Sequence, residues 1–464
     1  MRLALPAWTR RRSVAGLVML YAGKVSGILV SLLFIPLFSR TLGDSLFGAV
    51  AVILSLQVLL VMLDLGLSTL IARDVAAADQ RPEALLAQLQ DAAWILSTFY
   101  LALGAATVAL KLFTPWLVLD LWTSLGCVLL FALLTLQNLG YSTLLARQQY
   151  SAASTIQFIG NVGRAGITAL VLTQVSATLQ AFVAAQVACA ALHALATAVH
   201  SRRMLQADPA WTGRLDPQNR MATRWTLLRR GAPLALMMAA GASVLQLDKP
   251  IISALMSSAS TAPYFLAMTL CLVPTSILAG PVTQYFQPQL LQAASMANPK
   301  QTATVARRFV VALAAVTLLP CLVLWALREP LIRLWLGPQA GNALIGQYVE
   351  ILLPGITIGA LGYLPYSLLL SAQDYRFQAA LGTMLSITTL SLTAVSATLR
   401  SVEGVCFVYA GYHAAAMLLS WSRALWLPAT RPVARQTAVT ALACVAATGL
   451  LALLLALLTG GGSH

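Results

Sequence analysis

The sequence predicts an all-α integral membrane protein, and three observations indicate this class: its composition, its hydrophobic runs and the placement of its charges. Of the 464 residues, 59% are hydrophobic and only 9% are charged, whereas a soluble domain carries about 25% charged residues. The mean hydropathy is +0.81. Runs of about 20 apolar residues, the length that a helix needs to cross a bilayer, recur along nearly the whole chain. The alternating pattern of membrane β-strands is not seen.

Thirteen spans are expected in order along the chain. The first apolar run is too long for a signal-peptide core and lacks a small-residue cleavage site, so we interpret it as a span. Six spans are expected at 14–39, 47–71, 92–113, 117–146, 153–172 and 179–200. After a polar, basic stretch, six more are expected at 232–256, 264–286, 309–327, 348–371, 377–399 and 402–425. A last apolar run covers 438–458.

The basic residues support this order of spans. With the N-terminus in the cytoplasm, 21 of the 29 Lys and Arg residues fall in cytoplasmic segments, 5 fall outside and 3 lie within spans. The net charge of +15 is then explained by topology and by attraction to anionic membrane lipids. Because the charges are dispersed over many short loops, nucleic-acid binding is not expected. The stretch 201–231 places Trp225 beside arginines, which indicates either a helix at the cytoplasmic interface or a solvated basic linker.

An internal repeat divides the chain into two halves. Tyr141–Tyr150 matches Tyr366–Tyr375 at an offset of 225 residues, and each segment ends the fourth span of its half. Halves that run in the same sense predict two six-helix lobes, related by a pseudo-two-fold axis around a central cavity. We therefore predict an N-terminal lobe at 1–200, a cytoplasmic basic linker at 201–231, a C-terminal lobe at 232–427, and an extra transmembrane helix with its tail at 428–464.

Charged residues inside the spans are informative because they are costly there and usually face a cavity or a partner. Lys24 and Arg164 lie near the centre of their spans, and Lys249 lies toward the outer end of the seventh. One interpretation is a cationic cavity that binds an anionic group, with arginine in a forked geometry and lysine as a point charge. The alternative is that Asp64 and Asp248 neutralise these cations in structural pairs. Since neighbours on a helix point about 100° apart, only one of Asp248 and Lys249 is expected to face inward.

Four further residues are candidates for coupling transport to an ion. Asp64 and Asp248 could exchange a proton as access alternates, or could instead form salt bridges between helices. His193 and His413 occupy similar places in the two halves, where they could relay protons or simply pack. Prolines and glycines in the eighth and tenth spans predict kinks at candidate gates.

The chain contains no motif for catalysis. It has no P-loop, no H-E-x-x-H and no G-x-S-x-G, and none of its loops is long enough for a soluble catalytic domain. The six cysteines lie in apolar runs without C-x-x-C spacing and are expected to be packing residues. We therefore expect a transporter rather than an enzyme, with no metal and no cofactor.

Five segments of the chain carry a family resemblance: Pro36–Gly48, Leu63–Asp74, Leu247–Ser253, Tyr264–Pro288 and Pro330–Gly337. They resemble the polysaccharide and O-antigen (Wzx-type) oligosaccharide flippases of the MOP exporter superfamily, and the similarity covers about residues 14–427. It implies two lobes in a V-shape, alternating access, and a place in the bacterial inner membrane. The run at 438–458 departs from the twelve helices usual in that family, and lipid II flippases of the same superfamily carry two extra helices.

The resemblance also implies a substrate. It implies that undecaprenyl-diphosphate-linked glycan is flipped from the cytoplasmic to the periplasmic leaflet, for O-antigen, lipopolysaccharide or exopolysaccharide biosynthesis, with polysaccharide polymerases as candidate partners. The family's basic cavity residues correspond here to Lys24 and Arg164, and more weakly to Lys249. Polar residues of the spans that could contact the sugars are Gln57, Asn138, Asn161 and Gln246. The alternatives are a multidrug/cation antiporter or a lipid II flippase of the same superfamily, or a membrane glycan polymerase.

Overall fold

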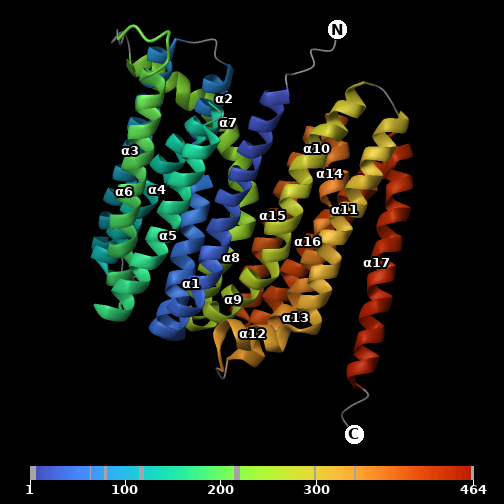
Figure 1. Ribbon diagram of the computed structural model, residues 1–464. Coiled ribbons are helices and arrows are strands. Elements are labelled where there is room, and N and C mark those ends of the chain that lie inside the picture. The colour runs from blue at the N-terminus through green and yellow to red at the C-terminus, as the bar shows by residue number, and fades with distance from the viewer. Residues whose placement is uncertain are drawn as a thin grey trace. The chain divides into compact units, whose positions relative to one another are not determined.

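The computed structural model describes residues 7–62, 64–77, 81–113, 120–147, 149–213, 220–296, 299–338 and 341–460. All regular secondary structure in these ranges is helical (Figure 1). Eleven helices within them are long and apolar enough to cross a membrane. The contacts divide the chain into two units, Met1–Leu247 and Asp248–His464. An all-α membrane protein built from two units is therefore confirmed, while the central cavity stays a prediction.

The described residues of the N-terminal unit form seven helices. They are α1 (Ala7–Met62), α2 (Leu67–Ala77), α3 (Pro82–Phe113), α4 (Leu121–Ala146), α5 (Tyr150–Gln174), α6 (Leu179–Gln206) and α7 (Arg220–Gln246). The first predicted span and most of the second lie in α1, and the second, 47–71, ends inside α2. Helix α1 is interrupted at Gly43, where φ is 70° and ψ is 168°. A positive φ is accessible to glycine without steric cost, so the chain can turn between two spans at this residue. Within the unit, α4 packs against α6, and α5 packs against both α1 and α6.

The predicted linker is mostly helical and is held against the N-terminal unit. Helix α6 continues to Gln206, and α7 already begins at Arg220. Arg224 of α7 donates from Nε to Asp91 of α3 at 2.8 Å, and its guanidinium lies 3.9 Å from the ring centroid of Trp94. Arg230 donates from Nη2 to both carboxylate oxygens of Asp74 in α2, at 3.1 and 3.2 Å. These pairs join α7 to the N-terminal unit, which extends to Leu247, and the domain boundaries drawn from the sequence stay predictions.

The segment before α7 is also tied to this unit. Glu83, in the first turn of α3, accepts hydrogen bonds at Oε1 from the backbone N–H and the hydroxyl of Thr212 and from the N–H of Gly213. Arg147 pairs with Asp208 at 3.5 Å. Trp225 remains 69% exposed, so this part of the chain has both ion pairs to the N-terminal unit and an exposed aromatic side chain.

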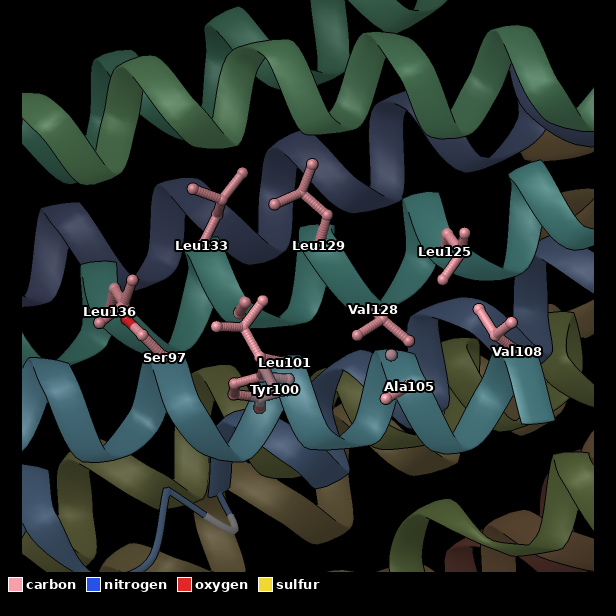
Figure 2. A pocket seen from close by; sticks show the side chains of 12 residues that line it. Ser97, Tyr100, Leu101, Ala105, Val108, Leu125, Val128, Leu129, Leu133 and Leu136 are labelled. Carbon is pink, nitrogen blue, oxygen red and sulfur yellow. The ribbon is translucent and has the colours of Figure 1, made fainter. Parts of the chain in front are cut away.

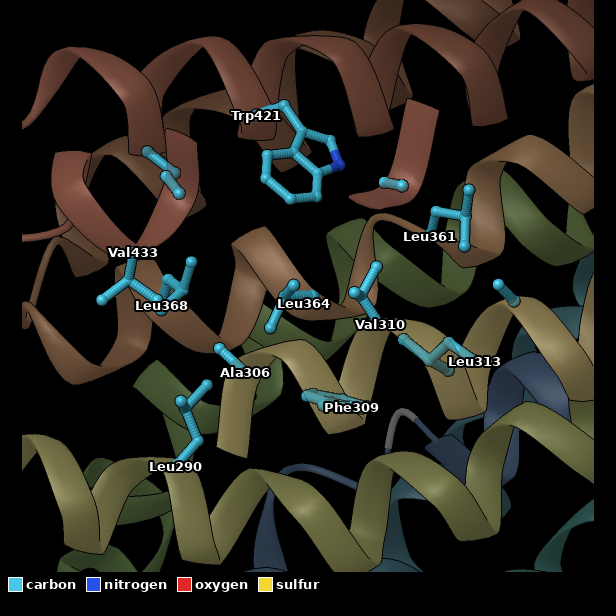
Figure 3. Packing of buried hydrophobic residues seen from close by; sticks show 14 of the residues in the cluster. Leu290, Ala306, Phe309, Val310, Leu313, Leu361, Leu364, Leu368, Trp421 and Val433 are labelled. Atoms are coloured by element: carbon cyan, nitrogen blue, oxygen red, sulfur yellow. The ribbon is translucent and has the colours of Figure 1, made fainter. Parts of the chain in front are cut away.

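The C-terminal unit contains the remaining helices. They are α8 (Asp248–Leu255), α9 (Ser258–Pro274), the π-helical turn η1 (Thr275–Ala279), α10 (Gly280–Ser295), α11 (Pro299–Ala326), α12 (Arg328–Leu336), α13 (Asn342–Ala360), α14 (Tyr363–Ser371), α15 (Tyr375–Thr398), α16 (Val402–Trp426) and α17 (Arg431–Gly460). Figure 3 shows the core of this unit, where Val433 of α17 joins Phe309 of α11 and Trp421 of α16 in one buried cluster. The extra helix is therefore an integral part of the unit.

Prolines account for two breaks inside predicted spans. The seventh predicted span, 232–256, is divided between α7 and α8 at Leu247, and the tenth, 348–371, is divided between α13 and α14. Pro250 cannot donate to the carbonyl of Gln246, and Pro365 cannot donate to that of Leu361, because proline lacks an N–H. The π-helical turn lies in the eighth predicted span, next to Gly280 and Pro281, so this span is irregular as expected.

The internal repeat extends to the hydrogen bonds of the backbone. In the first half, the N–H of Gln149 donates to the carbonyl of Leu144 at 2.9 Å, and that of Ala153 donates to the carbonyl of Gln149. The N–H of Asp374 donates to the carbonyl of Leu369 at 3.0 Å, which is the same bond 225 residues later. The same turn therefore joins the fourth and fifth predicted spans of each half, as the parallel repeat requires.

Candidate functional site

One face of α5 is polar although the helix is a candidate membrane span. Gln157, Asn161, Arg164 and Thr168 follow one another at intervals of four, three and four residues. This spacing places all four side chains on the same side of the helix. Thr168 is fully buried, and the other three are partly buried. A polar stripe of this kind within a span indicates packing against polar partners or a lining of a water-filled space.

Amide side chains link this stripe to α4. Gln137 of α4 donates from Nε2 to Oε1 of Gln157 at 2.9 Å, and Gln157 donates from Nε2 to Oδ1 of Asn161 at 3.3 Å. At the other end of the stripe, Gln186 of α6 donates from Nε2 to the hydroxyl of Thr168 at 3.1 Å. Arg164 therefore lies between two hydrogen-bonded groups of polar side chains.

Arg164 itself has no partner in the part of the chain that the structure describes. Its Nη1 is buried and makes no hydrogen bond, and no described carboxylate forms an ion pair with it. A buried cation without a counter-charge is costly, and a guanidinium can bind a phosphate oxygen pair in a forked geometry. The predicted pairing of Arg164 with Asp64 or Asp248 is not found among these contacts, so the residue is available to an anionic ligand.

His193 of α6 packs against the same stretch of α5. Its ring lies over Gly160, where an added Cβ would come within 2.3 Å of Nδ1, so only glycine fits at this position. Gly160 is one helical turn before Arg164, which brings the imidazole close to the guanidinium. The Nε2 of His193 and the Oε1 of Gln186 are both buried without a described partner. The α5–α6 interface thus has unused hydrogen-bonding capacity beside Arg164.

Of the other two predicted cations, one is paired and one is not described at its side chain. Lys24 lies in α1, but its side chain is outside the part that the structure describes, so its role stays a prediction. Lys249 is buried and its Nζ lies 2.9 Å from Oδ1 of Asp248. Oδ2 of the fully buried Asp248 accepts a hydrogen bond from the hydroxyl of Tyr264 at 2.7 Å, and the Tyr264 ring packs edge-on against Tyr409. Both side chains are buried and contact one another, and which of them faces a cavity stays a prediction.

Asp64 forms the turn that joins α1 to α2. Its Oδ1 accepts from the N–H of Gly66 at 3.0 Å, and its Oδ2 accepts from the N–H of Ser68 at 3.1 Å. Leu65 and Gly66 have positive φ angles, so the carboxylate stabilises a tight turn before the first helical residues. The polar contact continues to Asn138 of α4, which donates to the hydroxyl of Ser68 at 3.4 Å. Asp64 stabilises the turn between α1 and α2 through these hydrogen bonds. Its role in ion coupling stays a prediction.

His413 lies on α16 against Gly359 of α13, where an added Cβ would come within 2.7 Å of the histidine Cβ. Its ring packs edge-on against that of Tyr412, and its buried Nε2 has no described partner. The two histidines thus share one arrangement, in which the side chain packs against a glycine of a neighbouring helix of the same unit. This arrangement fits packing, and the relay of protons stays a prediction.

Sequence reasoning found Arg164 and Asn161 but missed the polar residues around them. The signal was present in the spacing of Gln157, Asn161, Arg164 and Thr168 within an apolar run. The partners Gln137 and Gln186 could not be assigned, because they come from two other helices. Among the described residues, no group of three His, Cys, Asp or Glu side chains is arranged to hold a metal ion.

Comparison with known proteins identifies the family. Residues 37–343 match the family model described as polysaccharide biosynthesis protein. The chain belongs to this family. The match covers most of the chain, including α5 with Arg164. No curated protein matches the chain in sequence.

Solved structures identify the fold of this family member. A multidrug resistance MATE family transporter of the MOP superfamily, in an inward-facing conformation, is 12% identical, with a TM-score of 0.70 over 90% of this chain and 98% of that chain. The lipid II flippase MurJ, in an inward closed conformation, is 13% identical, with a TM-score of 0.66 over 96% and 97%. A MOP superfamily transporter from Pyrococcus furiosus, whose binding pocket is described as having reverse polarity, is 12% identical, with a TM-score of 0.59 over 91% and 96%.

These relatives share the fold of this member of the polysaccharide biosynthesis family at low sequence identity. Its fold is that of MOP superfamily transporters, as the resemblance had predicted. Family and candidate spans together make it a multi-pass membrane protein of the polysaccharide biosynthesis family.

Proposed function

We propose that the protein flips lipid-linked oligosaccharide. Its substrate is an undecaprenyl-diphosphate-linked glycan, moved by alternating access from the cytoplasmic to the periplasmic leaflet of the bacterial inner membrane. The N-terminus is cytoplasmic in this proposal, because that orientation puts most arginines on the inside. The product serves the assembly of O-antigen, lipopolysaccharide or exopolysaccharide, and membership of the polysaccharide biosynthesis family supports this assignment.

One observation carries the proposal, the unpartnered guanidinium of Arg164 within a membrane span. A transporter of cationic drugs would need acidic and aromatic groups in its site, whereas an arginine favours an anion. A diphosphate carries the negative charge and the paired oxygens that a guanidinium binds best. The polar face of α5 then has two kinds of binding group for the substrate. Its arginine can bind the diphosphate, and its amides can bind the glycan.

Each group has a defined task in this mechanism. Arg164 binds the diphosphate as it enters from the cytoplasmic leaflet, and Lys24 adds a second positive charge. Gln157 and Asn161 lie two turns and one turn before Arg164, respectively, and can exchange their mutual hydrogen bond for bonds to sugar hydroxyls. Because such exchange keeps the number of hydrogen bonds nearly constant, the glycan can bind and leave without a large barrier. Anionic lipids and a polysaccharide polymerase are the proposed partners.

A leaflet assay tests the proposal. Purified protein is reconstituted in proteoliposomes with a fluorescent undecaprenyl-diphosphate oligosaccharide, and the fraction of lipid that reaches the opposite leaflet is followed over time. Wild type is compared with Arg164→Ala, with Arg164→Lys, and with Arg203→Ala as a matched control, because Arg203 is an exposed arginine at the end of α6 in the same unit. We expect wild-type transport with Arg203→Ala, a loss of at least tenfold with Arg164→Ala, and partial activity with Arg164→Lys.

Other outcomes would replace the proposal. If wild type moves no such lipid but exports cationic dyes under an ion gradient, the protein is a multidrug or cation antiporter. If it moves lipid II in preference to other linked glycans, it is a lipid II flippase. If Arg164→Ala transports the lipid as fast as wild type, the proposed substrate still stands, but Arg164 is not part of the site that binds it.

A further inference from the structure

A long apolar groove lies between α3 and α4 of the N-terminal unit. Its volume is about 480 Å³, and Figure 2 shows its lining side chains along the two helices. On α3 the lining runs from Ser97 to Val108, and on α4 from Leu125 to Leu136. Each stretch covers twelve residues, and the eleven steps from its first to its last residue correspond to a length of about 16 Å. Only Ser97 and Tyr100 bring polar atoms to this lining.

The groove opens to the hydrocarbon layer of the membrane. Leu101, on its rim, is 73% exposed, and Leu129 on the facing helix is also exposed. Trp94 and Trp122 are exposed three residues before the lining begins on α3 and on α4, respectively. Exposed tryptophans gather at the two interfaces of a membrane, so the lining lies between them at hydrocarbon depth. A lining of this chemistry at this depth suits a hydrocarbon chain of a lipid.

The lining of the groove includes a glycine that packing does not require. Gly104 lies within the α3 part of the lining, and an added Cβ would meet only Leu125 and Val128 at 3.9 Å, an ordinary contact distance. Gly126 of α4 is different, because an added Cβ there would lie 2.7 Å from Val183 of α6. Glycine lowers the stability of a helix, so one that is not needed for close packing indicates a need for space. A methyl-branched chain needs more width than a straight acyl chain.

We propose that the α3–α4 groove binds the polyprenyl chain of the transported lipid. This inference rests on the proposed function and assigns the part of the substrate that the polar face of α5 leaves unassigned. The groove ends next to that polar face. Its lining on α4 ends at Leu136, and the next residue, Gln137, donates a hydrogen bond to Gln157 on the polar face of α5. In a lipid of the cytoplasmic leaflet, the polar headgroup would lie on the side of this inner end and the chain would extend outward toward Val108.

The test fills the groove at Gly104. Gly104→Leu places a side chain in the space, and Ala106→Leu is the matched control, because Ala106 is exposed on the same helix and does not line the groove. Both variants are compared with wild type in the leaflet assay. A photoreactive polyprenyl diphosphate is also cross-linked to each protein, with dioleoyl phosphatidylcholine as competitor, and the labelled peptides are mapped.

We expect at least tenfold slower transport with Gly104→Leu, transport within twofold of wild type with Ala106→Leu, and labels on α3 and α4 that Gly104→Leu removes. Wild-type transport by Gly104→Leu, an equal loss in both variants, or labels elsewhere would overturn the proposal. Displacement of the probe by equimolar phospholipid would also overturn it and assign the groove to a bilayer lipid. If wild type moves no polyprenyl-linked glycan at all, the proposed function fails as well, which is a different result from an active protein whose groove is dispensable.

Discussion

Replacing Gly355 by alanine should destabilise the protein, whereas the same replacement at Gly382 should stabilise it. Gly355 of α13 faces the backbone of α16, and an added Cβ would lie 2.4 Å from both the Cα and the carbonyl oxygen of Ala410. Ordinary contact begins at 3.4 Å, so the two helices would have to separate by about 1 Å. Gly359 packs against His413 one turn away and would lose its contact as well. Overpacking of this kind costs about 1–3 kcal/mol.

The control has the opposite sign for a physical reason. Gly382 lies inside α15, and an added Cβ would meet nothing within 4 Å. Alanine is favoured over glycine in a helix interior by about 1 kcal/mol, and no clash opposes this gain. In a unit of this size, each kcal/mol corresponds to a change of about 2–4 °C in the midpoint of thermal unfolding. The two variants should therefore lie on opposite sides of wild type and differ by several degrees.

The buried thiols provide the assay. Cys271, Cys321 and Cys406 are free and buried in the same unit, so a thiol-reactive fluorescent dye reports their exposure when the detergent-solubilised protein is heated. Midpoints are compared at equal protein and detergent concentrations. If Gly355→Ala has the midpoint of wild type or a higher one, the close approach of α13 and α16 is not as described and the reasoning is refuted.

Three more changes can be measured in the same way. Asp91→Ala should cost about 1–3 kcal/mol by removing the partner of Arg224, and part of this loss should return in the double variant with Arg224→Ala; additive losses would disprove the coupling. Asp64→Ala should cost about 1–2 kcal/mol by removing the acceptor of two backbone N–H groups. If Asp64 only caps this turn, Asp64→Asn should retain transport, and a loss of transport would point to ion coupling instead. Hydrogen bonds from the hydroxyl and backbone N–H of Thr123 lower the pKa of Asp120, which precedes α4. This contribution is present above the unfolded pKa of about 4 and is lost as pH falls through the lower folded pKa, so Asp120→Asn should lose less stability than wild type between pH 5 and pH 3.

The spans themselves could be predicted wherever nothing interrupts an apolar run. The predicted span 377–399 corresponds to α15 (Tyr375–Thr398), and 402–425 corresponds to α16 (Val402–Trp426). The prediction for α3 began ten residues late, at 92 in place of 82, because the first turns carry Glu83 and Asp91. Both acids are buried by partners from beyond residue 210, which a local pattern of hydropathy cannot include.

The sequence predicts the positive charge of the candidate site, but not which residues of other helices surround it. An arginine in the middle of an apolar run is visible in the sequence, and so is the polar spacing that follows α5 from Gln157 to Thr168. The absence of a described counter-charge near Arg164 depends on where other helices place their carboxylates. The contact between Asp248 and Lys249 was not predicted from the sequence. The 100° separation of neighbouring side chains applies inside a helix, whereas these two residues are the first of α8, directly after Leu247.

The ion pairs of α7 allow the chain to be made in two pieces. Helix α7 contacts α1, α2 and α3, and its arginines reach acids on two of them. A gene split between Gly213 and Arg220 would leave the first piece with six helices and the second with α7 and the whole C-terminal unit. The ion pairs of Arg224 and Arg230 would then hold the separately translated fragments together, so co-expression should restore a working protein. A continuous backbone between α6 and α7 would then not be required for assembly, and fluorescent labels could be attached at the two new ends.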